Sequence, residues 1–506
     1  MMNVSQGSLR FKPLGLDTAY EYVVYLNAGC HVCRSEGFAA QARVVVSANG
    51  KTLIATLNIV RGQELGIDEA ALSLSAQAAL AVQPGDALTF SHVPVLRSTS
   101  HIRAKIYGQR LDPAALEAII DDTVAGRLSD LHLAAFVAAC AGDRLDIDET
   151  TALTEAMLNA GERLCWHRTP VVDKHCVGGL PGNRTTPIVV AIATACGLTM
   201  PKTSSRAITS PAGTADTMEV LAPVDLDIKA IRRVVDTVGG CVVWGGGMQL
   251  SPADDILIRI ERPLDLDSDG QLVASVLSKK LAAGSERVLI DLPVGPTAKV
   301  RDMAAAARLS QKLVTVGSRL GLQVDTLVTD GTQPVGHGVG PALEARDVLC
   351  VLQGSPLAPL DLRERALALA SHILELGGVT PPGEGLHRAT QTLDSGAAWQ
   401  QFVRICEAQG GLRNVPVAPL TQVICSERHG TVDSIDNRVL ARIAKLAGAP
   451  QSVSAGIDLH VRLGDPIARG QPLFTIHAEA PGELRYALAY AEAHADVITA
   501  REEARS

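Results

Sequence analysis

Two polar, glycine-rich loops between residues 170 and 220 restrict the fold of this chain more than any other feature. Each loop follows a short β-like segment and leads into a helix-like run. The first comprises Lys174–Asn183, with a helix expected from about Thr185, and the second comprises Ser204–Thr214, with a helix expected over Ala215–Leu221. Glycine lets a backbone approach a ligand closely, and the first N–H groups of a helix have no partner within it. We therefore predict two strand–loop–helix units whose loops face one phosphate-like ligand.

Neither loop follows a widely used phosphate-binding motif. Lys174 precedes the glycines, whereas the lysine of a Walker loop follows them, and the Gly-x-Gly-x-x-Gly spacing is absent. The alternative interpretation is that both loops are ordinary turns of an α/β sheet and that Lys174 is solvated.

Length and composition narrow the remaining possibilities. A chain of 506 residues has room for about three domains of ordinary size. Its net charge of −8 and the lack of a basic run argue against a nucleic-acid partner. The start of the chain has no hydrophobic signal region and no apolar run is long enough to span a bilayer, so we expect no membrane association. Ten cysteines in so long a chain do not suggest a disulfide framework, and we expect reduced thiols in the cytoplasm.

Changes in hydrophobic periodicity along the chain divide it into regions of different character. Strand-length segments dominate the beginning, helical periodicity follows, and then short β-like runs alternate with helices, which favours a mostly parallel sheet covered on both faces. The predicted fold class is a multidomain α/β protein with a β-rich N-terminal domain and an α+β C-terminal domain. The expected domains are 1–97 (β-rich), 98–170 (helical, with returning segments near 221–232 and 270–283), 171–417 (α/β, phosphate-binding) and 430–506 (α+β).

The N-terminal region contains half of a zinc-like motif. Cys30 and Cys33 have the spacing of a ligand pair, but no second pair of Cys or His residues accompanies them. We favour local packing over metal binding and expect no metal site. Strands are expected at Tyr22–Leu26, Ala42–Ser47 and Leu53–Val60.

The two loops also resemble those of a known family. Asp173–Gly179 (DKHCVGG) and Ser204–Glu219 (SSRAITSPAGTADTME) are similar to the phosphate loops of thymidine and pyrimidine-nucleoside phosphorylases. The second loop is most similar to the long branch of that family, the AMP phosphorylases and type 2 thymidine phosphorylases, which carry an extra N-terminal domain. The similarity runs from about Ser100 to His477. It implies a homodimer whose helical domain forms the dimer contact and faces the phosphate loops across a cleft.

The resemblance assigns roles to particular residues of the two loops. It implies that phosphate is held by Lys174, Cys176, Gly178, Gly179, Thr186, Ser204 and Thr214, and that the nucleoside lies against Ser205, Arg206, Ala207, Ile208, Thr209 and Ser210. Cys176 departs from the family, which usually has serine there. Because a thiol is a weak donor, we expect either a lower affinity for phosphate or a neighbouring residue that takes the place of the serine.

Two residues are candidate proton donors to the leaving base. His175 can supply a proton near neutral pH, and Asp267 lies where the AMP phosphorylase branch has its proposed donor. A carboxylic acid in that role requires burial that raises its pKa. The alternative is that Asp267 is the N-cap of the helix that follows, and Asp265 and Asp269 are close enough in sequence to compete for the role.

Further residues are expected to contact the base and the 5′ end of the substrate. Ser275 and Lys279 share a helix face and match the base-contacting serine and lysine of the family, and Lys299 matches a nucleotide-contacting lysine of the AMP branch. Leu257 and Ile260 stand where the pyrimidine enzymes have a tyrosine and an arginine, while Arg259 and Arg262 are out of register. Because this loss weakens base recognition, the sequence favours a nucleoside 5′-monophosphate as the substrate without excluding thymidine.

The expected reaction is therefore phosphorolysis of an N-glycosidic bond in a nucleoside or nucleoside 5′-monophosphate, which yields a free base and a pentose 1-phosphate. Inorganic phosphate is the co-substrate, and no metal or organic cofactor is expected. One alternative is a phosphoribosyltransferase of related fold, although no adjacent Asp-Glu pair follows the loops to hold magnesium. Another is a non-catalytic nucleotide sensor, supported only by Cys176 and the lost base-reading residues.

Overall fold

A computed structural model describes residues 8–207, 210–264, 266 and 268–501. The chain divides into two compact units, one comprising residues 1–144 with 256–266 and the other comprising residues 145–255 with 267–506. None of the helices in these described ranges is long and apolar enough to cross a membrane.

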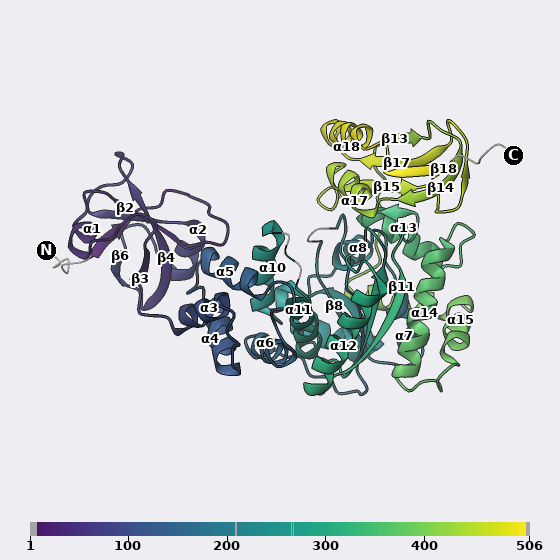
Figure 1. Cartoon of the computed structure of the whole chain (residues 1–506), viewed down its shortest axis with the longest axis horizontal. Coiled ribbons are helices and arrows are strands. Elements are labelled where there is room, and N and C mark those ends of the chain that lie inside the picture. The colour runs from purple at the N-terminus through teal and green to yellow at the C-terminus, as the bar shows by residue number, and fades with distance from the viewer. Residues whose placement is uncertain (1–7, 208–209, 265, 267, 502–506) are drawn as a thin grey trace. The chain divides into compact units, whose positions relative to one another are not determined.

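The first unit begins with a closed six-stranded β-barrel (Figure 1). Its strands follow the order β1-β5-β2-β4-β3-β6, and Asn49 and Gly50, both with positive φ, form the tight turn between β3 and β4. Cys30 and Cys33 are buried in the barrel core, where the Cys30 sulfur accepts a hydrogen bond from the Cys33 N–H. The elements are β1 (Ser8–Phe11), β2 (Val23–Asn27), α1 (His31–Glu36), β3 (Arg43–Ala48), β4 (Lys51–Val60), β5 (Glu69–Leu72), α2 (Leu74–Leu80) and β6 (Ala87–His92).

The rest of the first unit is helical, and local signals explain where its helices begin. The Asp112 carboxylate accepts from the Ala115 N–H, with Pro113 in the first helical turn, and Ser129 forms a capping box with His132. The helices are α3 (Arg97–Ile106), α4 (Pro113–Val124) and α5 (Asp130–Cys140), together with the second half of α10 (Pro252–Leu264).

The second unit is built on parallel strands, which confirms the predicted α/β class. Strands β7 (Val172–Cys176), β10 (Arg287–Val294) and β11 (Gln323–Asp330) pair in the order β11-β10-β7, and β8 (Met200–Ser204) pairs with β9 (Gly240–Trp244). A parallel bridge between Val171 and Thr199 connects β7 to β8. Since ligands of open parallel sheets bind at the carboxyl ends of the strands, the expected site lies where β7 and β8 end.

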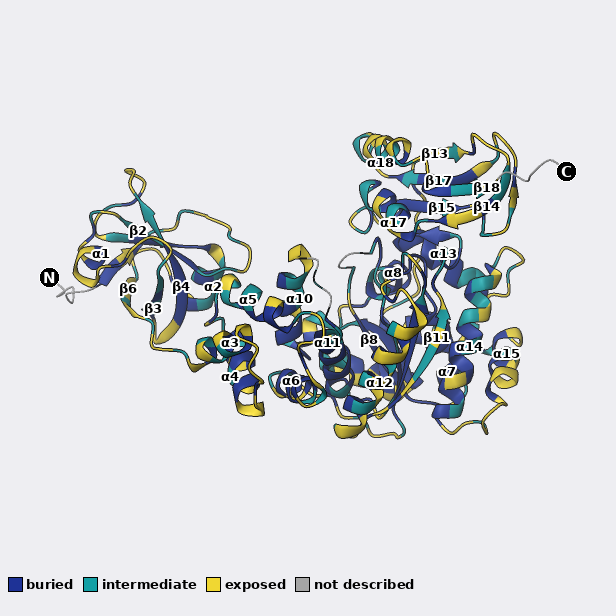
Figure 2. Cartoon of the chain, viewed as in Figure 1, coloured by how far each residue is buried: buried dark blue, intermediate teal, exposed yellow. Residues whose placement is uncertain are grey.

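The helices of this domain pack around these strands. Helix α7 has no exposed residue because it is apolar on all sides and lies among α14, α16 and the strands, and Figure 2 shows α7 and β8 largely dark blue. Helix α9 packs against β9 and α16, whereas α11 packs against α6. The helices are α6 (Ile147–Asn159), α7 (Thr186–Ala195), α8 (Thr214–Leu221), α9 (Ile228–Val238), α11 (Asp269–Ala282), α12 (Met303–Arg319), α13 (Pro341–Leu352), α14 (Leu360–Leu376), α15 (Gly385–Asp394) and α16 (Ala397–Gln409), with a short 3-10 turn at Gly246–Met248.

The C-terminal part is an α+β domain, as predicted. Its larger sheet has the antiparallel order β12-β15-β17-β13, and β12 comes from the loop that precedes α13, so the two domains share a sheet. A second sheet has the order β16-β14-β18. The elements are β12 (Gly338–Val339), β13 (Leu420–Cys425), β14 (Gly430–Ile435), α17 (Asn437–Leu446), β15 (Gly456–Leu459), β16 (Pro466–Ile467), β17 (Pro472–Ala478), α18 (Pro481–Ala493) and β18 (Ile498–Arg501).

Candidate active site

The first glycine-rich loop connects the end of β7 to the start of α7. Gly178, Gly179 and Gly182 all have positive φ, at 91°, 82° and 71°. Residues with a side chain rarely adopt this conformation, so the path of the loop depends on glycine. Thr186 is the first residue of α7, and its position places a hydroxyl beside the free N–H groups of the helix end. The loop therefore has the form of an anion-binding turn.

Lys174 lies beneath this loop and is 1% exposed, so the alternative of a solvated Lys174 is wrong. Its Nζ donates to Thr185 Oγ1 at 2.8 Å and lies 3.8 Å from the Asp291 carboxylate. Asp291 is fully buried and also accepts from Asn183 at 3.1 Å and Thr329 at 2.6 Å. The ammonium group is thus fixed at the carboxyl end of the sheet, next to the start of α7.

The second loop folds back on the first turn of α8. The Asp216 carboxylate accepts from the N–H groups of Ala207 and Gly213, and the Ser205 carbonyl accepts from Ala215 N–H. Ser204 ends β8 with its hydroxyl buried and without a hydrogen-bond partner in the part of the chain that the structure describes. A buried hydroxyl without a partner is costly, and a ligand oxygen at this position would satisfy it.

Other members of the predicted set in this loop have protein partners. Arg206 forms ion pairs with Glu219 and Asp216 and lies over the Trp244 ring at 5.0 Å, and Ser210 donates to the Ala212 carbonyl at 2.9 Å. These contacts favour a role for Arg206 in shaping the loop. Ile208 and Thr209, predicted to contact the nucleoside, lie outside the described residues.

Arg184 connects the two loops, and the sequence analysis missed it. Its guanidinium donates to Thr214 Oγ1 at 2.9 Å, to the Ala212 carbonyl at 2.9 Å and to the buried Glu344 carboxylate at 2.5 Å. Burial raises the pKa of Glu344, and the Arg184 charge opposes that rise. One side chain from the first loop thereby fixes the predicted phosphate ligand Thr214 of the second. The sequence signal that could have identified Arg184 is its position directly before the start of α7.

His175 is held in its neutral form. Burial lowers its pKa well below 6.5, and the nearby charges of Lys280, Lys202, Lys279 and Lys174 lower it further. The lowered pKa opposes the predicted release of a proton by His175 near neutral pH, because it disfavours the protonated imidazole. A neutral imidazole can still donate one N–H hydrogen bond.

A buried charge cluster lies next to His175 and organises this part of the sheet. The fully buried Asp173 carboxylate accepts from Lys280 Nζ at 2.7 Å and lies 3.5 Å from Lys202 Nζ. The lysine charges hold the pKa of Asp173 below its ordinary value despite its burial. Burial lowers the pKa of Lys202 well below its ordinary value, and Lys280 and Lys174 lower it further.

Cys176 is a protonated thiol. Its burial and the nearby Asp291 charge raise its pKa to about 12, and its sulfur accepts from Asn183 Nδ2 at 3.4 Å. A thiol in this state is a poor nucleophile.

The predicted base-contacting pair lies on α11. Lys279 Nζ donates to Ser275 Oγ at 3.2 Å and to the buried Asp254 carboxylate at 2.7 Å. Lys279 is close enough to His175 for its charge to lower the pKa of that imidazole, so this pair and the first loop share one region. Lys299 is exposed, and its backbone N lies 2.5 Å from where a Cβ of Gly179 would stand. These contacts bring the predicted phosphate and substrate residues together.

The candidate proton donor Asp267 lies outside the described residues, as does Asp265. The N-cap of α11 is Ser268, whose hydroxyl accepts from the Gln271 N–H, so the cap is not Asp267. The carboxylate of the competing Asp269 lies 3.5 Å from Lys312. Asp267 stays the predicted donor.

The two positions predicted to lack the base-contacting tyrosine and arginine of the family carry buried apolar side chains. Leu257 and Ile260 on α10 are 3% and 6% exposed. Arg259 makes a two-pronged ion pair with Asp130, with both N–O distances at 2.9 Å, and lies over the Tyr20 ring. The side-chain contacts of Arg259 are thus with residues of the first unit.

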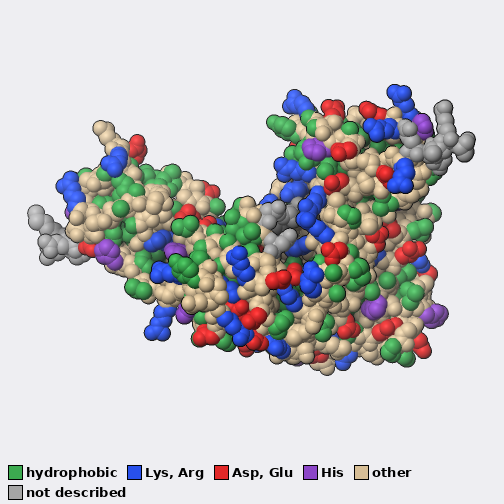
Figure 3. All heavy atoms as spheres, in the orientation of Figure 1, with side chains coloured by type: hydrophobic (Ala, Val, Ile, Leu, Met, Phe, Trp, Pro, Cys, Tyr) green, Lys and Arg blue, Asp and Glu red, His purple; other side chains and the backbone are tan. Residues whose placement is uncertain are grey.

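Positive side chains gather on the second unit. Figure 3 shows a run of Lys and Arg (blue) from its C-terminal domain to its α/β domain. Within the ranges that the structure describes, no three His, Cys, Asp or Glu residues are grouped so that they could hold a metal ion.

Comparison with known proteins agrees with this geometry. Three family models match in order: the helical bundle domain of a glycosyl transferase family over residues 99–161, its a/b domain over 168–399, and the pyrimidine nucleoside phosphorylase C-terminal domain over 431–497. A solved structure of anthranilate phosphoribosyltransferase from Thermus thermophilus is 20% identical, covers 61% of this chain and 99% of its own, and superimposes with a TM-score of 0.50. At that identity the likeness concerns the fold alone.

Relatives along the whole chain are much more similar. "Putative thymidine phosphorylase 2" of Acidovorax sp. (strain JS42) is 63% identical over 484 residues, which cover 96% of this chain and 94% of the relative. "Putative thymidine phosphorylase" of Polaromonas sp. (strain JS666 / ATCC BAA-500) is 59% identical over 504 residues, with 100% and 99% covered. A protein of the same name from Legionella pneumophila (strain Paris) is 56% identical over 490 residues, with 97% and 95% covered. The chain belongs to the thymidine and pyrimidine-nucleoside phosphorylase family.

Proposed function

We propose that this protein cleaves the N-glycosidic bond of a nucleoside or nucleoside 5′-monophosphate with inorganic phosphate, releasing a free base and a pentose 1-phosphate. The observation that carries the proposal is the pairing of the two loops. The buried ammonium of Lys174 lies under a glycine turn, and the adjacent strand ends at Ser204, whose hydroxyl has no hydrogen-bond partner among the described residues. An anion with several oxygens suits both groups.

The proposed reaction follows from these positions. A phosphate oxygen attacks the anomeric carbon as the bond from that carbon to the base nitrogen breaks, and the bonding electrons leave with the base. Fixed positive charge and N–H groups hold the phosphate in place, which supplies orientation and electrostatic stabilisation. The neutral His175 offers a hydrogen bond, and Asp267 is the proposed source of the proton that the departing base takes up.

Two substrates are candidates, and different observations favour them. Thymidine is favoured by the names of the relatives, and its products would be thymine and 2-deoxyribose 1-phosphate. AMP is favoured by the exposed Lys299 beside Gly179, which suits a 5′-phosphate, and by the apolar residues Leu257 and Ile260 in place of base readers. Its products would be adenine and ribose 1,5-bisphosphate.

The proposal includes the setting of the enzyme. Phosphate is a co-substrate, and the reaction as proposed uses no metal or organic cofactor. A cytoplasmic enzyme is consistent with ten cysteines, none in a disulfide. A homodimer through the helical domain is supported by the exposed apolar side chains of Tyr107 and Leu131, which are 79% and 80% exposed.

The test is release of free base, followed by chromatography, with phosphate present or absent. The panel comprises thymidine, uridine, AMP, CMP and UMP. Release from monophosphates alone would assign the enzyme to the nucleotide branch, and release from thymidine or uridine would make it a nucleoside phosphorylase. Release that does not depend on phosphate, or no release at all, would refute the proposal and favour a nucleotide sensor. A parallel assay with free base, magnesium and phosphoribosyl pyrophosphate tests the phosphoribosyltransferase alternative.

A further inference from the structure

The C-terminal domain reaches the candidate site through Asn437, the first residue of α17. Asn437 is 1% exposed, and its Nδ2 donates to Thr297 Oγ1 at 3.0 Å and to the Gly331 carbonyl at 3.1 Å. The next residue, Arg438, donates from Nε to the Thr297 carbonyl at 3.3 Å. Thr297 and Gly331 follow the carboxyl ends of β10 and β11. Helix α17 is therefore hydrogen-bonded to the site edge of the parallel sheet.

The loop that Asn437 holds supports one half of the first glycine-rich loop. Residues 295–300 form a compact turn, with Gly295 N–H donating to the Val300 carbonyl and Ala298 N–H donating to the Gly295 carbonyl, both at 3.1 Å. The backbone of Lys299 lies so close to Gly179 that a Cβ there would stand 2.5 Å from its nitrogen. A shift of the 295–300 turn would therefore remove the support of Gly179.

A second residue of the C-terminal domain supports the other half of the loop. Arg462 donates to the Pro334 carbonyl at 2.9 Å and to the Gly336 carbonyl at 2.5 Å. Val335, between them, donates its N–H to the Pro181 carbonyl at 3.1 Å, and its own carbonyl lies 2.1 Å from where a Cβ of Gly182 would stand. Arg462 is thus connected to Pro181 and Gly182 through one short segment.

The hydrogen bonding of the Asn437 side chain is incomplete. Its Oδ1 is buried and makes no hydrogen bond within the described part of the chain, although its Nδ2 is fully used. Burying an amide with an unpaired acceptor opposes folding, so stability alone does not explain an asparagine here. The asparagine is explained by its Nδ2 group, which fixes the segments of Thr297 and Gly331 relative to α17.

We propose that Asn437 and Arg462, here called the anchor residues, are positioning residues for the phosphate subsite. They touch neither phosphate nor nucleoside. Each instead fixes a segment that packs against one half of the loop from Gly178 to Gly182, and so holds the loop in its anion-binding form. This inference rests on the proposed function and adds to it a catalytic purpose for the C-terminal domain.

The test separates KM for phosphate from KM for the nucleoside. Asn437→Asp keeps the size of the side chain but points a carboxylate at the Gly331 carbonyl, and Arg462→Gln removes both donors to the 334–336 segment. We expect each change to raise KM for phosphate at least fivefold, while KM for the nucleoside at saturating phosphate changes less than twofold. Thr297→Val, which removes one acceptor of Asn437 from the opposite side, gives a smaller rise of the same kind.

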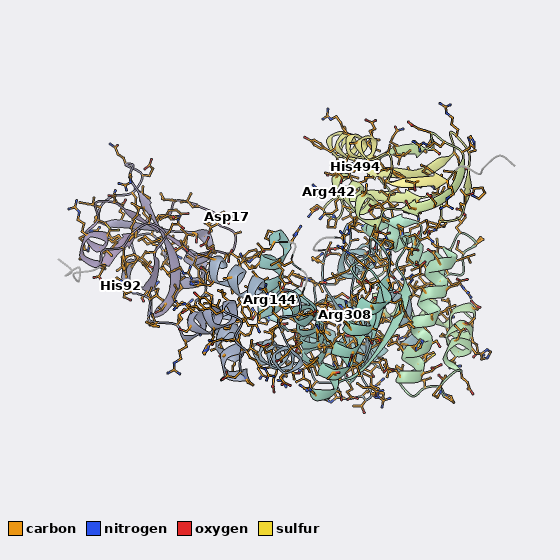
Figure 4. All side chains as sticks on the ribbon, viewed as in Figure 1. Asp17, His92, Arg144, Arg308, Arg442 and His494 are labelled. Atoms are coloured by element: carbon orange, nitrogen blue, oxygen red, sulfur yellow. The ribbon has the colours of Figure 1, made fainter. Side chains whose placement is uncertain are left out.

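Two matched variants serve as controls. Ser452→Ala removes a hydrogen bond to Glu483 of 2.7 Å inside the C-terminal domain. Arg442→Ala removes an exposed positive charge from the same helix as Asn437 (Figure 4). Both are expected to leave KM for phosphate within twofold of the wild type.

The outcomes are distinguishable. An unchanged KM for phosphate in folded Asn437→Asp and Arg462→Gln overturns the inference, and an equal rise in Arg442→Ala assigns the effect to overall charge and overturns it too. Should Asn437→Asp fail to fold by circular dichroism, Thr297→Val decides: an unchanged KM for phosphate in that variant refutes the role of Asn437. If the wild type does not consume phosphate, the proposed function itself has failed.

Discussion

Replacing the buried Lys174 with methionine separates its contribution to stability from its contribution to catalysis. Methionine has nearly the shape of lysine, so Lys174→Met removes the charge without opening a large cavity. The Nζ–Oδ2 distance to Asp291 is 3.8 Å. At an effective dielectric constant near 20, that attraction amounts to about 4 kcal/mol.

Two effects make the expected loss of stability smaller than this electrostatic attraction. The variant no longer buries an ammonium group, and Asn183 and Thr329 continue to donate hydrogen bonds to Asp291. We therefore expect the free energy of unfolding to fall by about 3 kcal/mol, the lower end for breaking one partner of a buried ion pair. Turnover should fall at least about a thousandfold, as when one fixed donor is lost from a site that stabilises developing charge.

The assays are urea unfolding by circular dichroism and phosphate-dependent base release at saturating phosphate. Lys202→Met is the matched control, because Lys202 is also buried and its Nζ lies 3.5 Å from another buried carboxylate, that of Asp173. That swap should lower the free energy of unfolding by a similar amount, about 3 kcal/mol. Turnover of Lys174→Met within tenfold of the wild type would refute the phosphate site. A loss of stability in Lys174→Met that is much smaller than the loss in Lys202→Met would refute the charge argument.

Three further outcomes are expected. Cys176→Ser, which introduces a stronger donor, should lower KM for phosphate about threefold, and an increase would contradict a role for this side chain at the anion. The pKa of His175 is lowered from 6.5 in the folded protein, so only the unfolded chain takes up this proton and stability is lost as the pH falls below 6.5. His175→Gln should therefore recover about 1.4 kcal/mol of the free energy of unfolding that the wild type loses between pH 7.5 and 5.5. Urea unfolding measures this difference, and an identical pH dependence in both proteins would contradict it. Arg184→Lys, which cannot reach Thr214, Ala212 and Glu344 together, should raise KM for phosphate about tenfold, and an unchanged KM would show that the contact between the loops is dispensable.

Features that depend on nearby residues could be predicted from the sequence. The strands expected at Tyr22–Leu26, Ala42–Ser47 and Leu53–Val60 follow local periodicity signals, and the start of α7 follows the glycine-rich loop before it. The structure has β2, β3, β4 and α7 within two residues of the expected positions. The three short barrel strands β1, β5 and β6 were not predicted. Their partners are distant in sequence, since β1 pairs with β5 and β6. Each of these strands is also too short for a clear alternation of apolar and polar residues.

The missed site residues have a related cause. Arg184 meets Glu344 across 160 positions, and Asn437 meets Thr297 across 140. The lowered pKa of His175 could not be predicted for the same reason, because the positive charges that contribute to it include Lys202 and Lys280, which no local motif connects to it. A single sequence reveals which residues can bind an anion, but the charges around each one come from the tertiary fold.

The closed barrel at the start of the chain limits how that domain can recognise another molecule. Each of its six strands has a hydrogen-bonded neighbour on both sides. Among the barrel strands that the structure describes, no backbone edge is therefore open for an extended peptide to join as an additional strand. A partner of this domain would have to be selected by side chains on its outer surface, so its specificity can change by surface substitution while the hydrogen-bonded frame stays the same.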